Sequence, residues 1–79
     1  MSINIKEKYN LPQSLTNQDD LDTALNVFYS EEVQSTDLKH LRFGQFIYNI
    51  YNIEIDNSYN IKDPYLVYKL ILDYIKIIN

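Results

Sequence analysis

Three stretches of the chain carry apolar residues at the spacing i, i+3, i+4, i+7, which is typical of helices that bury one face. This spacing predicts helices over about residues 17–31, 37–52 and 63–78. The apolar positions are Leu21, Ala24, Leu25 and Phe28 in the first helix and Phe43, Phe46, Ile47 and Ile50 in the second. We therefore expect an all-α fold, in which residues 1–79 form one compact three-helix domain with an extended N-terminal arm.

Polar residues before each helix indicate where it begins. Thr16 with Asp19 three residues later resembles a capping box, so the first helix should begin shortly after Thr16. Thr36 precedes the central helix as its N-cap. Asp63 followed by Pro64 is the clearest start signal, because proline at the first helical position loses no hydrogen bond.

The third helix is apolar over about two thirds of its circumference, and only Lys69, Asp73 and Lys76 form a polar line along it. Two other helices can cover about half of such a surface. Two interpretations follow. Part of the third helix contacts another chain, as a homodimer or in a groove of a protein partner, or the N-terminal arm covers the remainder in a monomer.

Short alternating patterns flank the helices. Ile3 and Ile5 alternate with polar residues near the N-terminus, as Ile53 and Ile55 do after the central helix. The two segments either pair as a minor two-stranded ribbon or form an arm and a loop, because an isolated pair of strands is only marginally stable. Residues 6–14 are expected to form a coil that docks on the core.

The central helix carries a polar stripe and the only glycine of the chain. Arg42, Gln45 and Asn49 recur at i, i+3 and i+7, and their guanidinium and amide groups suit a flat polar surface on a partner. The solvated side of any surface helix has the same composition. Gly44 costs the helix about 1 kcal/mol relative to alanine. We expect another backbone, such as that of a crossing helix, to approach Gly44 closely and offset this cost.

The composition excludes several catalytic and metal-binding chemistries. The chain has no cysteine, which removes thiolate zinc sites and thiol nucleophiles, and its one glycine is too few for a phosphate-binding loop. Its single histidine, His40, has no serine and acid arranged beside it as a catalytic group. We therefore expect no enzyme activity, no catalytic residue, no cofactor and no metal site.

The apolar runs of the chain predict a cytoplasmic protein without membrane contact. The first ten residues lack the apolar core of a signal peptide. The most apolar run, residues 65–78, is too short to cross a bilayer and contains three charged residues. The absence of cysteine fits a reducing compartment.

Acidic residues outnumber basic ones and are unevenly distributed. The chain has 11 Asp and Glu against 7 Lys and Arg, a net charge of −4, which disfavours contact with a phosphate backbone. The stretch from Asp19 to Asp37 holds no basic residue. Its acids form either an ordinary solvated face or a partner-binding surface that imitates a nucleic-acid backbone. The candidate partner-binding acids are Asp19, Asp20, Asp22, Glu31 and Glu32.

The central helix resembles a motif in a group of small uncharacterised bacterial and phage proteins. That group shares an Asp-Leu-Arg-x-Gly-Gln-type helix with an asparagine four residues on, and a short terminal helix that opens with acidic residues. The matching residues, over about positions 20–76, are Leu41, Arg42, Gly44, Gln45 and Asn49, then Asp63, Tyr65 and Leu66. Pro64 stands where the group more usually has an acid. The resemblance implies a compact helical accessory protein, commonly from a mobile element, and supplies no activity.

These observations predict a non-catalytic accessory protein that binds a protein partner, as a phage or mobile-element inhibitor or adaptor of a host or defence protein. The alternative is a small nucleic-acid-binding or regulatory module that uses Arg42, Gln45 and Asn49 as contacts. Basic residues near this stripe are few, because only Lys39 lies one turn from Arg42. The charge balance therefore favours a protein partner over nucleic acid.

Overall fold

All regular secondary structure within residues 5–78 is helical. The computed structural model describes residues 5–78. Its elements are α1 (Ile5–Lys8), α2 (Gln18–Phe28), α3 (Glu31–Gln34), the 3₁₀ helix η1 (Asp37–His40), α4 (Phe43–Tyr51), the 3₁₀ helix η2 (Ser58–Asn60) and α5 (Pro64–Ile78). No strand occurs among these described residues, which confirms the all-α prediction. The predicted ribbon is wrong for them, because Ile5 is helical and Ile53 and Ile55 lie in a loop; Ile3 is outside the described range.

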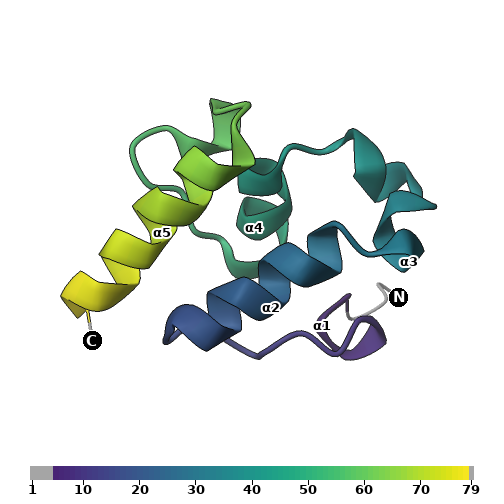
Figure 1. The fold of residues 1–79 in the computed structure, drawn as a ribbon, viewed down its shortest axis with the longest axis horizontal. Helices are drawn as coiled ribbons and strands as arrows, with labels where there is room; N and C mark the ends of the chain where they lie inside the picture. The colour runs from purple at the N-terminus through teal and green to yellow at the C-terminus, as the bar shows by residue number, and fades with distance from the viewer. Residues whose placement is uncertain (1–4, 79) are drawn as a thin grey trace.

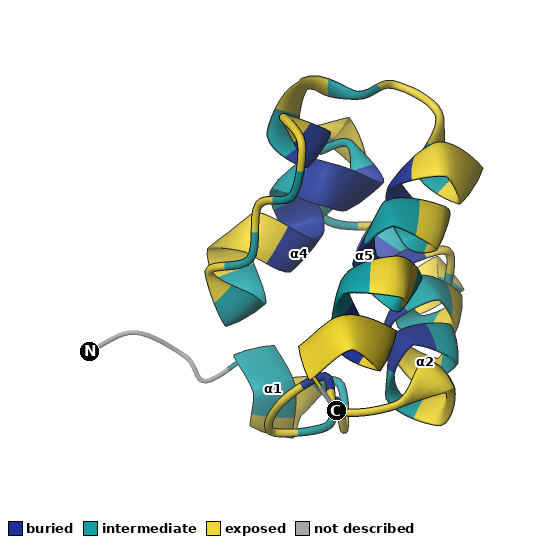
Figure 2. Ribbon diagram, turned by 90° about the vertical axis from the view of Figure 1, so that its left-hand side faces the viewer, coloured by how far each residue is buried: buried dark blue, intermediate teal, exposed yellow. Residues whose placement is uncertain are grey.

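The three longer helices, α2, α4 and α5, contact one another pairwise around one core (Figure 1). The buried residues of α4 gather on its side toward α2 and α5 (Figure 2). The segment before α2 docks on the core through the buried Leu11 and Leu15, as expected, but residues 6–8 belong to the helix α1 and are not the predicted coil. The core consists of Leu11, Leu15, Leu21, Ala24, Phe28, Val33, Phe43, Phe46, Ile47, Val67, Ile71 and Ile75.

The first long helix is shorter than the sequence predicts, and its cap is different. Asn17 is the N-cap of α2, and its side-chain oxygen accepts the backbone N–H of Asp20 at 2.9 Å. Thr16 donates both its N–H and its hydroxyl to the Asp20 carboxylate, at 3.0 and 2.8 Å, so Asp20 takes the place predicted for Asp19. The helix ends at Phe28, because Ser30 caps a separate short helix, α3.

The predicted central helix over residues 37–52 is two elements. Thr36 caps η1, as its hydroxyl accepts the N–H of Leu38 at 3.1 Å, but the helix stops at His40. Leu41 and Arg42 are extended, with ψ of 147° and 159°, and α4 begins at Phe43. The break has a tertiary cause, since η1 packs against α3 whereas α4 packs against η2, and one straight helix cannot follow both.

The start of the last helix agrees with the sequence. Pro64 is its first residue, and the Asp63 carboxylate accepts the backbone N–H of Tyr65 at 2.9 Å. Asp63 thereby satisfies one of the free N–H groups at the helix start. From there α5 continues to Ile78 along α2 and α4 (Figure 1).

In the part of the chain that the structure describes, four residues other than glycine have left-handed backbone conformations: Asn10, Asn52, Asp56 and Asn57, with φ between 49° and 67°. Asn52 ends α4, and Asp56 and Asn57 form the turn before η2. Asparagine and aspartate tolerate this conformation better than other side chains do. The turn after α4 can therefore fold back over that helix without glycine.

Candidate partner-binding site

Gly44 lies where the backbone of the η2 turn comes very close to α4. It is buried, and a Cβ atom placed on it would lie 2.0 Å from the carbonyl oxygen of Ser58. This confirms that Gly44 faces protein rather than water. The approaching backbone belongs to the η2 turn and not to a crossing helix, which corrects that part of the prediction.

The predicted polar stripe is divided by the break before α4. Arg42 is the N-cap and lies outside the helix, where its guanidinium Nη1 donates to the carbonyl of Asn60 at 3.0 Å. The side-chain oxygen of Gln45 accepts the backbone N–H of Arg42 at 2.9 Å. Asn49 is exposed. Gln45 therefore caps the start of α4 and Arg42 ties it to η2, and a partner-binding role for Arg42, Gln45 and Asn49 stays a prediction.

The five candidate acids do not form one continuous surface. Asp20 accepts the two hydrogen bonds from Thr16, and Asp22 accepts the hydroxyl of Tyr68. Asp19 is exposed at the start of α2, whereas the exposed Glu31 and Glu32 follow its far end. An eleven-residue helix is about 16 Å long, which separates the two groups. Two of the acids stabilise the fold, and the others are solvated at opposite ends of α2.

The apolar surface of α5 is only partly covered by the rest of residues 5–78. Its core-facing residues are Val67, Ile71 and Ile75. On another side, Leu66, Leu70 and Ile77 lie within about 40° of one another around the helix axis, and we call them the outer α5 row. Leu66 is 47% exposed and Ile77 is 83% exposed, while Leu70 is half-buried. Exposed residues along α5 are visible in Figure 2, and the described part of the N-terminal arm, from residue 5 onward, leaves this row exposed.

A pocket of about 260 Å³ lies where the end of α2, the start of α4 and the start of α5 meet. Three of the seven basic residues of the chain, Lys39, Arg42 and Lys62, line it. We call it the basic pocket. Its other lining residues are Phe28, Tyr29, Gln34, Leu41, Phe43 and Pro64. The sequence places Lys39 near Arg42 but gives no sign of this pocket, because Lys62 and the aromatic lining residues come from distant segments.

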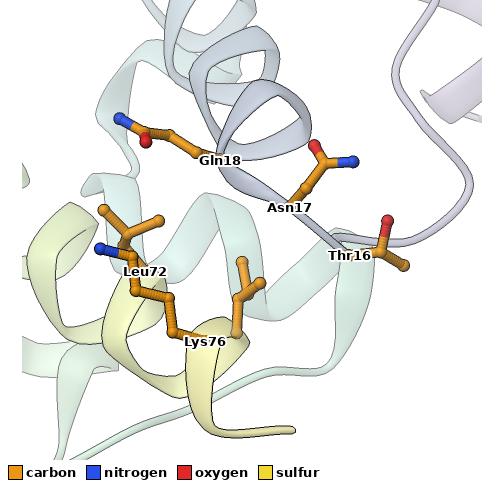
Figure 3. Close-up of a pocket in the computed structure, with 6 residues that line it drawn as sticks. Thr16, Asn17, Gln18, Leu72 and Lys76 are labelled. Atoms are coloured by element: carbon orange, nitrogen blue, oxygen red, sulfur yellow. The ribbon is translucent and has the colours of Figure 1, made fainter. Parts of the chain in front are cut away.

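A second hollow, of about 330 Å³, lies between the start of α2 and the end of α5. Figure 3 shows Leu72 and Lys76 on α5 opposite Asn17 and Gln18 on α2. The polar groups at its edge already serve the fold, since Asn17 caps α2 and the Gln18 amide donates to the Tyr68 hydroxyl at 3.2 Å. This hollow therefore offers little chemistry of its own.

Three tyrosine hydroxyls are held in their protonated form. The hydrogen bond to Asp22 raises the pKa of Tyr68, and burial raises the pKa of Tyr29. Burial also raises the pKa of Tyr51 to about 12, and its hydroxyl donates to the carbonyl of Pro12 at 2.7 Å. These shifts are opposite to those of an activated nucleophile or base. The hydroxyls of Tyr51 and Tyr68 hold separate segments together through hydrogen bonds.

Comparison with known proteins found no similar protein: no family model, curated protein or solved structure matches the chain. Within residues 5–78, no helix has both the length and the apolar character needed to span a membrane. In the same range, no three His, Cys, Asp or Glu side chains are placed to share a metal ion. The outer α5 row and the basic pocket remain the candidate binding features within residues 5–78.

Proposed function

We propose that this chain is a non-catalytic accessory protein that binds the surface of a larger protein, as an inhibitor or adaptor. The outer α5 row carries the proposal. It consists of large apolar side chains on a different side of α5 from Val67, Ile71 and Ile75, which already complete the core, so nothing in the fold of residues 5–78 requires it. A row of apolar residues along one side of a helix is the usual anchor for a groove on a partner.

The size of the row suits an interface anchor. Leu66 and Ile77 are eleven positions apart, so the row is about 16 Å long. Burying a leucine or isoleucine side chain fully contributes about 1.5–3 kcal/mol. Two or three such anchors contribute a large part of the binding free energy of a micromolar complex, which is about −8 kcal/mol. The polar residues beside the row would form the rim of the interface.

Features elsewhere in the chain support a binding role over a catalytic one. The tyrosine hydroxyls with shifted pKa are stabilised in their neutral form, and those of Tyr51 and Tyr68 donate to a backbone carbonyl and to a carboxylate. Catalytic nucleophiles and bases need the opposite shift or an adjacent proton acceptor that is free to react. Arg42 and Gln45 also have hydrogen-bond partners within the chain, which weakens the case for nucleic-acid contacts there.

The proposal is tested by capturing partners with a tagged chain from a nuclease-treated lysate of the source organism. One variant combines Leu66→Ser with Ile77→Ser, and a matched control combines Lys69→Ser with Lys76→Ser on the polar line of the same helix. We expect one protein to be retained by the wild type and the control and lost by the variant. The purified partner protein should then bind the variant at least tenfold more weakly than the wild type, which is equivalent to about 1.4 kcal/mol.

Two outcomes contradict the proposal. Retention of the same protein by the Leu66→Ser, Ile77→Ser variant would show that the outer α5 row is not the interface. Recovery of only the chain itself, with a dimer mass in sedimentation equilibrium that the variant loses, would reassign the row to self-association.

A further inference from the structure

We propose that the basic pocket binds the carboxylate of a glutamate or aspartate in a peptide segment of the partner protein. This inference rests on the proposed function, because it assigns a second contact, of different chemistry, to the same protein partner. The outer α5 row supplies apolar burial, whereas this pocket would select a partner that carries an acidic residue. Three observations support this inference: the charge of the pocket, the geometry of Arg42 and the shape of the pocket.

The first observation is the gathering of unneutralised positive charge in an acidic chain. Lys39 comes from η1, Arg42 from the start of α4 and Lys62 from the segment before α5. No carboxylate lines the pocket, and none of the acids in residues 5–78 forms an ion pair with these three side chains. Like charges that share one pocket repel each other, so a bound anion would stabilise all three at once.

The second observation is that Arg42 is already positioned. It is half-buried, and its Nη1 donates to the carbonyl of Asn60 on η2, which fixes the guanidinium relative to the pocket. A guanidinium has five N–H donors in a planar fork, so others remain for a carboxylate. Arginine and carboxylate form paired, charge-assisted hydrogen bonds, and a fixed arginine loses little side-chain entropy on forming them.

The third observation is the apolar floor of the pocket. The rings of Phe28 and Phe43 are buried with their centroids 5.6 Å apart, and Pro64 and the half-buried Leu41 complete the wall. A volume of about 260 Å³ admits one or two side chains and not an extended ligand. The methylene groups of a glutamate, or an apolar neighbour, can contact this floor while the carboxylate reaches the basic groups.

Acidic residues near the pocket favour a peptide ligand over a polyanion such as a nucleic acid. Asp63 lies close enough to raise the pKa of Tyr29 at the pocket wall, although its carboxylate accepts the N–H of Tyr65. Glu31 and Glu32 are exposed on α3, next to Gln34 of the pocket. A nucleic acid would bring flanking phosphates against these acids, and its binding energy depends on many phosphate contacts. A single carboxylate can contact the basic groups without bringing further negative charge close to these acids.

The test uses two short peptides with blocked ends, one with the sequence Gly-Leu-Glu-Phe-Gly and one with glutamine in place of glutamate. Each is titrated into the ¹⁵N-labelled full chain and followed by NMR. The chain has a single arginine, so the Nε–Hε signal of Arg42 reports directly on the pocket. We expect the glutamate peptide to shift this signal and the amides of Lys39 and Lys62 in a saturable way, and the glutamine peptide to leave them unchanged.

Matched charge variants show whether the pocket itself is responsible. Lys39→Gln with Lys62→Gln should weaken the glutamate peptide roughly fivefold to tenfold, as expected for the loss of two partly exposed ion pairs. Lys8→Gln with Lys76→Gln removes the same charge away from the pocket and should change the affinity less than twofold. Arg42 is kept in both variants, because it also holds η2 through Asn60.

Several results would overturn the inference. These are equal binding of the two peptides, no saturable shift with either peptide, and equal weakening by the two double variants. Tighter binding of a single-stranded oligonucleotide or of inorganic phosphate would replace the carboxylate with a phosphate ligand. The Leu66→Ser, Ile77→Ser variant should bind the glutamate peptide normally, so failure of the α5 interface and failure of the basic pocket are told apart.

Discussion

Gly44 shows how one residue without a side chain determines the arrangement around it. Because the carbonyl of Ser58 would lie 2.0 Å from a Cβ at this position, η2 can rest on α4 only if the residue is glycine. Ser58 is itself fully buried, and its hydroxyl accepts the N–H of Ile55 at 3.0 Å. The turn is therefore held from both sides and cannot move away easily.

We expect Gly44→Ala to destabilise the protein despite the higher helix propensity of alanine. Forcing an extra methyl group into a packed site costs about 1–3 kcal/mol. In a domain of this size, that loss lowers the melting temperature by on the order of 10 °C. Asn49→Ala on the same helix is the control and should have a neutral or slightly stabilising effect, because Asn49 is exposed. A higher melting temperature for Gly44→Ala would show that the contact with Ser58 is absent.

The partners of the Arg42 and Gln45 side chains could not be predicted from the sequence pattern. The pattern correctly predicted a buried apolar face with Phe43, Phe46 and Ile47, because burial follows from periodicity alone. It could not distinguish a polar residue that contacts a partner from one that binds its own chain. The acceptor of Arg42 is the carbonyl of Asn60, 18 residues away, and no local pattern announces it.

Elements were predictable where their signals are local. Asp63 and Pro64 set the start of α5 through one side-chain acceptor and one fixed φ angle, both of which are visible in the sequence. The break at Leu41 and Arg42 has no such signal, since both residues have ordinary helix propensity. Packing of η1 on α3 and of α4 on η2 imposes it. The separate helix α3 was missed because its cap, Ser30, lies within an otherwise helical pattern.

The cap of α5 gives a prediction for that element. Asp63→Ala removes the acceptor of the Tyr65 N–H and should cost about 1 kcal/mol of stability, measured as a lower urea midpoint at unchanged m-value. Asp63→Ser keeps an acceptor at the same place and should lose much less. Equal losses in the two variants would mean that charge near the helix start, rather than the cap, provides the stabilisation.

For the whole molecule, the docking of residues 6–14 on the core was predicted, but neither the contacts that hold this arm nor the basic pocket could be. Lys39, Arg42 and Lys62 meet only because η1, α4 and the start of α5 converge. The arm is tied to α4 by the hydroxyl of Tyr51, which donates to the Pro12 carbonyl, while the ammonium of Lys6 lies 5.0 Å from the centre of the same ring. Contacts between residues so distant in sequence depend on the complete fold.

The hydrogen bond from Tyr51 to Pro12 should make the stability of the protein fall as the pH rises into the alkaline range. Because the pKa of Tyr51 is 10.0 in the unfolded reference and about 12 in the fold, the protonated hydroxyl favours the folded state. This contribution is complete below pH 10 and should be lost progressively as the pH rises toward 12. Urea midpoints at pH 8, 10 and 11 should therefore fall.

The Tyr51→Phe variant distinguishes the contribution of Tyr51 to this pH dependence from the contributions of the other tyrosines. The variant should be less stable at pH 8 by about 1 kcal/mol, because it lacks the hydrogen bond to Pro12. Its stability should decline less steeply than that of the wild type above pH 10, with Tyr29 and Tyr68 still contributing in both proteins. Parallel declines would assign the alkaline transition to those other hydroxyls.

The left-handed residues have a consequence for any saturation-mutagenesis survey of this protein. Asn10, Asn52, Asp56 and Asn57 are all exposed, yet each must keep a positive φ angle that β-branched and bulky residues resist. We expect these positions to accept glycine, asparagine or aspartate and to reject valine or isoleucine. Intolerance at an exposed residue is commonly taken as a sign of partner contact. Here it would reflect backbone conformation, and a contact map built on tolerance scores alone would place a false site over the turn before η2.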